Sequence, residues 1–154
     1  MPPADLSRDD QEFDLQRFLD AQAPVYAEAL RELREGQKRT HWCWFVLPQI
    51  RGLGRSEMAV RYAIASLDEA RAYLAHPVLG ARLRETVDAV NAHMGTPAER
   101  MLGRIDAMKF HSCVTLFAQA AEPGSPFHRA LDAFFGGAGD RLTLDELARQ
   151  AVVD

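Results

Sequence analysis

The stretch PVYAEALRELREG at residues 24–36 carries the pattern that decides the fold of this chain. Its apolar residues recur every three or four positions, which is the spacing of one face of an α-helix. Pro24 suits the first helical turn, where its missing backbone donor costs nothing. Gly36 suits the residue just after a helix end, where the backbone turns left-handed. The stretch therefore predicts one amphipathic helix with a marked beginning and end.

The same start and stop signals recur along the chain. Residues 66–69 (SLDE), 96–99 (TPAE) and 143–146 (TLDE) match the capping box, and Ser125 precedes a proline at another helix start. Hairpin turns of the Asn-Gly or Asp-Gly type are missing. The apolar run at 42–47 would suit a buried strand as well as a helix, but a lone strand would have no partner, so a helix is favoured. We expect an all-α, compact single-domain bundle of about six to eight short helices.

The composition fits one helical domain. With 154 residues and 47% hydrophobic residues, the chain can bury a sizeable core without a disulfide or a structural metal. We expect this domain over residues 12–154, after a flexible N-terminal arm at 1–11. Cys43 and Cys113 stand alone in apolar stretches, which indicates buried free thiols in a reducing compartment. Because neither a signal peptide nor a run of about 20 apolar residues is present, a soluble, cytoplasmic protein is predicted.

Several classes of partner and cofactor are disfavoured. A net charge of −4 and a pI near 5.7 argue against a nucleic-acid-binding surface, and no membrane association is expected. The five histidines show no i, i+3 or i, i+4 pairing, and the two cysteines form no C-x-x-C motif. We therefore expect no metal and no cofactor. The oligomeric state is left open by the sequence.

Several sequence strings together resemble a known family. They are FDLQRF at 13–18, HWCWF at 41–45, PQ at 48–49 with GLG at 52–54, HPVLG at 76–80, DAMK at 106–109 with Ser112, LF at 116–117, and GD at 139–140 with TL at 143–144. Their order and spacing resemble the bacterial domain-of-unknown-function family 1810, whose members are mainly α-helical and sometimes labelled calpastatin-like. The resemblance implies a helical fold over most of the chain and carries no catalytic residues with it. Calpain inhibitors are long, disordered and repeat-bearing, unlike this chain.

The segment at 38–56 is the predicted ligand site. It joins a tryptophan-rich run to a loop with two glycines between two arginines, so amide, guanidinium, hydroxyl and backbone donors lie close together in sequence. The residues expected to bind a ligand are Lys38, His41, Trp42, Gln49, Arg51, Gly52, Gly54, Arg55 and Ser56. Glycines allow close approach to the backbone, and Ser56 can start a helix whose amides favour an anion. The loop matches neither a dinucleotide fingerprint nor a P-loop, so it could equally be an ordinary solvated turn.

Two further features leave alternatives open. Trp42, Trp44 and Phe45 could form a stacking wall, although such residues are more often core. Asp106, Lys109 and Ser112 recur every three residues, so they lie on one stripe of a helix. That stripe could serve acid–base chemistry or hold an ordinary i, i+3 ion pair, and the ion pair is favoured.

The functional hypotheses follow from how these groups would meet. The first is an uncharacterised domain that binds a small anionic or nucleotide-like ligand. The second is a metal-independent hydrolase or transferase whose catalytic candidates are His41, Asp106 and Lys109. The third is a protein-interaction module. Convergence of His41, Arg55, Asp106 and Lys109 in one pocket would favour the first two, and Tyr62 and Arg82 are expected as neighbours of that pocket.

Overall fold

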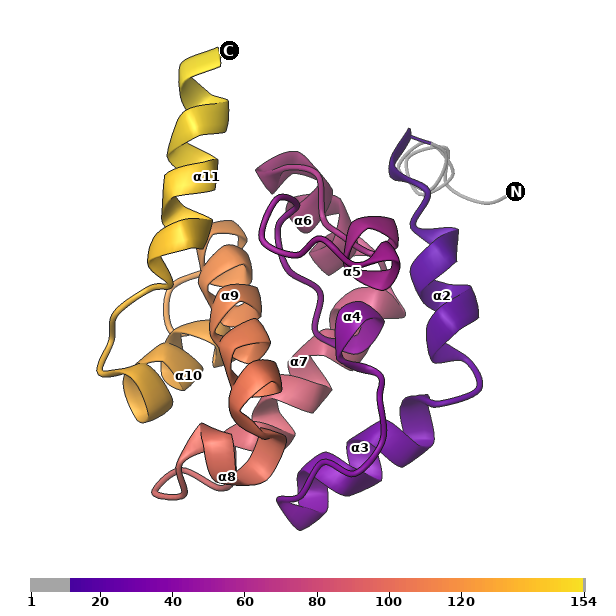
Figure 1. Cartoon of the computed structure of the whole chain (residues 1–154), viewed down its shortest axis with the longest axis vertical. Coiled ribbons are helices and arrows are strands. Elements are labelled where there is room, and N and C mark those ends of the chain that lie inside the picture. Colours follow the sequence, from indigo (N-terminus) through magenta and orange to yellow (C-terminus); the bar gives the residue numbers. More distant parts are fainter. Residues whose placement is uncertain (1–11, 154) are drawn as a thin grey trace.

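The computed structural model describes residues 12–153 and shows an all-α protein over this range (Figure 1). Its helices are α2 (Gln16–Gln22), α3 (Tyr26–Glu35), α4 (Cys43–Val46), α5 (Glu57–Arg61), α6 (Leu67–Ala75), α7 (Leu79–Asn91), α8 (Ala98–Leu102), α9 (Arg104–Ala120), α10 (Pro126–Phe135) and α11 (Arg141–Val153). The predicted arm at 1–11 lies outside the described residues. The expected six to eight helices were too few, because α4, α5 and α8 have only four or five residues and are too short to show a helical period.

The central element of the bundle is α9, which contacts α4, α6, α8, α10 and α11 (Figure 1). It is 17 residues long and buries side chains on several sides. Phe110, Cys113 and Phe117 are fully buried in one hydrophobic cluster that also includes side chains from α3, α6, α7 and α10. Met108 of the same helix is 65% exposed, because it lies on the solvent side of α9.

Most of the predicted helix signals are confirmed. Ser56, Ser66 and Ser125 each accept a hydrogen bond from the backbone N–H three residues later, so they cap α5, α6 and α10. Gly36 and Gly136 have φ values of 78° and 62°, the left-handed conformation that ends α3 and α10.

Two of the predicted capping boxes are wrong. Thr96 does not cap α8, because Pro97 occupies the cap position without a side-chain hydrogen bond. Thr143 lies inside α11 rather than at its start. The capping carboxylate there belongs to Asp140, which accepts hydrogen bonds from the Thr143 N–H at 3.1 Å and hydroxyl at 2.7 Å. An aspartate can therefore supply the cap that the box assigned to the threonine.

The ambiguous run at 42–47 forms the single turn α4, so the helical interpretation is confirmed. Just after it, Ile50 and Ile64 form an isolated parallel bridge, with the Arg51 N–H donating to Ile64 and the Ile64 N–H donating to Gln49. Over residues 12–153 this pair does not extend into a sheet. None of the helices described over this range combines the length and apolar character needed to cross a bilayer.

Candidate functional site

A buried carboxylate fixes the chain segment that enters the site. Glu32 of α3 is fully buried and accepts hydrogen bonds from the backbone N–H groups of Arg39 and Thr40, from the Thr40 hydroxyl and from the Trp42 indole at 2.7–3.1 Å. Burial alone would raise the pKa of Glu32, but these hydrogen bonds outweigh it and lower the pKa to about 2. The backbone N–H of Lys38 also donates to Met101 at 2.8 Å. Residues 38–42 are therefore held between α3 and α8.

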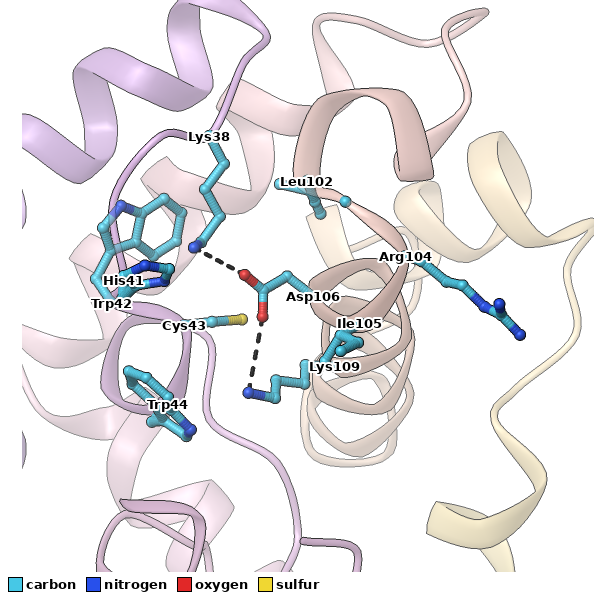
Figure 2. A pocket seen from close by; sticks show the side chains of 11 residues that line it. Lys38, His41, Trp42, Cys43, Trp44, Leu102, Arg104, Ile105, Asp106 and Lys109 are labelled. Carbon is cyan, nitrogen blue, oxygen red and sulfur yellow. Dashed lines mark ion pairs between the residues drawn. The ribbon is translucent and has the colours of Figure 1, made fainter. Parts of the chain in front are cut away.

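This anchoring brings two lysines to one carboxylate. Asp106, in the first turn of α9, lies between Lys38 and Lys109, with Nζ···O distances of 2.7 Å and 3.7 Å (Figure 2). The Lys38 ammonium lies 4.9 Å from the ring centre of Trp42, and the Lys109 ammonium lies 4.7 Å from that of Trp44. Each ammonium therefore has both a carboxylate oxygen and an aromatic face as a neighbour.

These groups line a pocket of about 520 Å³, which we call the lysine pocket. Its lining residues are Lys38, His41, Trp42, Cys43, Trp44, Leu102, Gly103, Arg104, Ile105, Asp106 and Lys109. The volume lies in the range of small-molecule sites. Figure 2 shows Arg104 pointing away from the ion pairs, so its guanidinium does not add to their charge. The pocket therefore combines a cluster of charged groups with apolar walls.

The lysine pocket holds every lysine and every tryptophan of the chain. The sequence has eighteen lysine and arginine residues, of which only Lys38 and Lys109 are lysines, and its two tryptophans are Trp42 and Trp44. Because lysine is so rare in this chain, Lys38 and Lys109 could have been considered together from the sequence alone. Glu32 also carried a signal, because an acidic residue at the spacing of Ala29 lies on the apolar face of its helix.

Cys43 and His41 differ in what they can contribute. Burial, together with the charge of Asp106, raises the pKa of the Cys43 thiol to about 12, so this cysteine is a protonated wall residue rather than a nucleophile. His41 is exposed at the pocket edge. Among the described residues, its ring makes no hydrogen bond to Asp106 or Lys109.

The part of the chain that the structure describes contains no group of three His, Cys, Asp or Glu side chains placed to hold a metal ion.

The glycine loop lies in a different pocket, so the segment at 38–56 does not form the one continuous site that was expected. Arg51, Gly52 and Gly54 line a crevice of about 460 Å³ together with Glu146 and Arg149 of α11, which we call the arginine crevice. The Arg149 guanidinium pairs with Glu146. The hydrogen bond from Arg149 and the charge of Arg51 lower the pKa of Glu146. The turn α4 and the Ile50–Ile64 bridge lead the chain away from the lysine pocket, which explains the division.

The remaining predicted residues line neither pocket. Gln49 is half-buried next to the bridge, Arg55 is exposed, and Ser56 serves as the cap of α5. Tyr62 packs among core rings, and Arg82 donates to Gln22 at 3.3 Å.

The three α9 residues expected on one stripe, Asp106, Lys109 and Ser112, do not all line the lysine pocket. Ser112 donates to Asp140 at 3.2 Å, away from the lysine pocket, whereas Asp106 and Lys109 face His41 across it. Of the four groups whose convergence was considered, the pocket brings together all but Arg55.

The fold and the site together describe a small helical protein with a cationic, aromatic-lined pocket. Residues 12–147 match the family described as "Protein of unknown function (DUF1810)", and the chain belongs to this family. It is also similar to the conserved hypothetical protein Rv1873 from Mycobacterium tuberculosis, known from a crystal structure. The two share 50% identity with a TM-score of 0.86, covering 89% of this chain and 98% of that one. The comparison with curated proteins found no match.

Proposed function

We propose that the protein binds a small anionic ligand in the lysine pocket. The observation that carries this proposal is that two ammonium groups share a single carboxylate. Asp106 can balance only one of the two positive charges, so the triad has a surplus of one positive charge. Buried Leu102 and partly buried Trp44 line the same pocket, and apolar surroundings strengthen the attraction of an anion to that charge.

The distances indicate which lysine would contact the ligand. The side chain of Lys38 is only 5% exposed and is held by Asp106 and by the carbonyl oxygen of Thr40. Lys109 is 21% exposed, and its 3.7 Å separation from Asp106 is too long for a hydrogen bond. Its ammonium therefore keeps its donors for an incoming phosphate or carboxylate oxygen.

The arginine crevice is a weaker site for such a ligand. Its cations already face a carboxylate of the chain, because Glu146 pairs with Arg149 and lies near Arg51. An external anion would have to compete with Glu146, which is attached to the same molecule. The 51–56 loop remains part of the ligand-binding hypothesis only as this second site.

A binding experiment can separate the two pockets. Thermal unfolding is followed in a panel of inorganic phosphate, small carboxylates and nucleotides. A ligand at a hundredfold excess over its dissociation constant stabilises the fold by about 2.7 kcal/mol. Lys109→Met should remove this gain, because it keeps the length of the side chain and deletes the charge. Arg104→Met deletes one positive charge from the same helix, but from a side chain that points away, so it should keep the gain.

The results of this experiment distinguish binding in the lysine pocket, binding in the arginine crevice and no binding. Stabilisation that depends on Lys109 and survives Arg104→Met supports the lysine pocket. Stabilisation that survives Lys109→Met but is lost in Arg51→Ala moves the site to the arginine crevice. If no member of the panel stabilises the unmodified protein, the proposed function is wrong.

A further inference from the structure

The use of lysine in this chain is selective. Where a positive charge pairs with a carboxylate elsewhere in the described residues, the cation is an arginine, as in Arg17–Glu69 and Arg129–Asp88. The two lysines of the chain instead meet at Asp106. A guanidinium stays protonated and cannot act as a nucleophile, whereas a lysine amine can lose its proton and attack a carbonyl carbon. A requirement for charge alone does not explain why both positions are lysine.

The surroundings of Lys109 match those of lysines that form imines. Nucleophilic lysines are found in apolar pockets and near a second cation, and here Lys38 lies on the other side of the carboxylate that both lysines share. Asp106 stays balanced by Lys38 at 2.7 Å, so it does not depend on Lys109 for its counter-charge. Trp44 provides an apolar wall beside the amine.

We propose that Lys109 captures the carbonyl group of a small anionic aldehyde or ketone as an imine. This proposal rests on the proposed function, because the surplus charge attracts the anionic group of the same ligand. Lys109 is the reacting residue because it is the more exposed of the two lysines, while Lys38 is held by Thr40 and Asp106.

The chemistry balances without an oxidant or a metal. The Lys109 ammonium first gives one proton to Asp106. Its nitrogen then attacks the carbonyl carbon, a C–N bond forms as the carbonyl π bond breaks, and a second proton passes from the nitrogen to the carbonyl oxygen to give a hydroxyl. That hydroxyl takes the proton back from Asp106 and leaves as water while the C=N bond forms. One ammonium and one aldehyde therefore give one protonated imine and one water, and the positive charge of the site is kept. Asp106 is placed to accept a proton from the attacking nitrogen and to return it to the leaving oxygen.

Hydride trapping tests the proposal directly. The protein is mixed with glyoxylate or with pyridoxal 5′-phosphate, reduced with borohydride and analysed by intact mass and peptide mapping. We expect the reduced adduct mainly on Lys109, with little on Lys38 or on the α-amine of the chain. Lys109→Arg should lose the adduct because it keeps a positive charge but removes the amine. Arg104→Met should keep the adduct on Lys109, because the Arg104 side chain points away from the ion pairs.

The variant Asp106→Asn tests whether Asp106 positions Lys109 and relays its proton or has only a structural role. It should slow adduct formation, whereas binding of glycolate, which has the charge of glyoxylate without its carbonyl group, should be kept. Calorimetry with glycolate reports this binding independently of the trapping reaction.

Two results would contradict the proposal that Lys109 forms an imine, and they differ in whether the anion-binding function survives. If glycolate binds in a Lys109-dependent manner but neither aldehyde labels Lys109 above the α-amine, the pocket binds anions and the imine is wrong. If labelling is equal on Lys38, Lys109 and the α-amine and no anion binds, the proposed function fails with it.

Discussion

The lysine pocket and the arginine crevice contain the same kinds of groups, cations around a single carboxylate, but they are built differently. In the lysine pocket, Asp106 is 19% exposed and its partner Lys38 is 5% exposed, with residues from α4, α8 and α9 around them. In the arginine crevice, Arg149 is 60% exposed and pairs with Glu146 only three positions away on the same helix. Exposed pairs of this kind contribute little to stability and are screened by salt. A functional site is therefore expected where ionic groups are held by distant parts of the chain.

The two pockets also differ in how firmly the chain segment that lines each of them is held in place. The entry segment of the lysine pocket is fixed by Glu32, whose carboxylate lies in the interior with four donors around it. The glycine loop has no comparable buried anchor among the described residues. Its ordered contacts are the bridge to Ile64 and the serine cap of a five-residue helix. Substitutions can test whether this difference in support is real.

The largest effect is expected at Trp42. Its side chain is fully buried and donates to Glu32, so Trp42→Ala should destabilise the fold by about 3–5 kcal/mol through cavity formation and the loss of this hydrogen bond. Trp44→Ala should cost about 1 kcal/mol, because Trp44 is only partly buried at the pocket wall. Chemical denaturation measures both. Equal losses would show that the two indoles have the same structural role and would contradict this assignment.

The next effect is expected at Glu32. Glu32→Gln keeps the shape of the side chain but turns one acceptor into a donor that faces N–H and O–H groups, so it should destabilise by about 3 kcal/mol. Glu35→Gln is the matched control on the same helix, because Glu35 is exposed and pairs only with Arg31 and Arg39. Its loss should stay below about 1 kcal/mol. If Glu35→Gln is as unstable as Glu32→Gln, the inference that the buried Glu32 carboxylate is a special anchor is wrong.

Acid should weaken the anchor of the lysine pocket in a defined range. The pKa of Glu32 is lowered from 4.5 to about 2, so its contribution is fully present above pH 4.5 and is lost as the pH falls towards 2. The contribution is on the order of 3 kcal/mol. Glu32→Gln should lack this component of the pH dependence. Unfolding free energies measured from pH 6 to 2 in both proteins test it, and identical slopes would be the contrary result.

The fold could be predicted further than the site, for physical reasons. Helix period and end signals are local, so the helix that ends at Gly36 and the serine caps of α6 and α10 were correct from sequence. The predicted start at Pro24 was wrong, because α3 begins at Tyr26 and Val25 occupies its cap position. The failures at Thr96 and Thr143 are also local, because a proline or a neighbouring aspartate can take over the cap. Helices of a single turn, such as α4, have too few residues to show a period.

The site depends on contacts that sequence spacing cannot show. Residues 38–56 were treated as one unit because they are neighbours in sequence, although α4 turns the chain between its two halves. The pairing of Lys38 with Asp106 joins the segment after α3 to the first turn of α9, 68 positions away. In the other pocket, Glu146 reaches the glycine loop from α11. Asp106 and Lys109 were recognised as a pair on one helix, and the i, i+3 ion pair that was favoured is present. For the second lysine, Lys38, the rarity of lysine was the available sequence signal, and the contact with Asp106 itself came from the fold.

The smallest effect is expected in the arginine crevice. The double change Arg51→Ala and Arg149→Ala should alter the unfolding free energy by less than about 0.5 kcal/mol, because both guanidiniums are exposed. It should also leave any stabilisation by phosphate or carboxylates unchanged, since Lys38 and Lys109 are untouched. The stability is measured by chemical denaturation and the ligand response by thermal unfolding in the same buffers. A double variant that folds normally but has lost the ligand response would place the anion at the glycine loop, and the contrast between the two pockets would then be reversed.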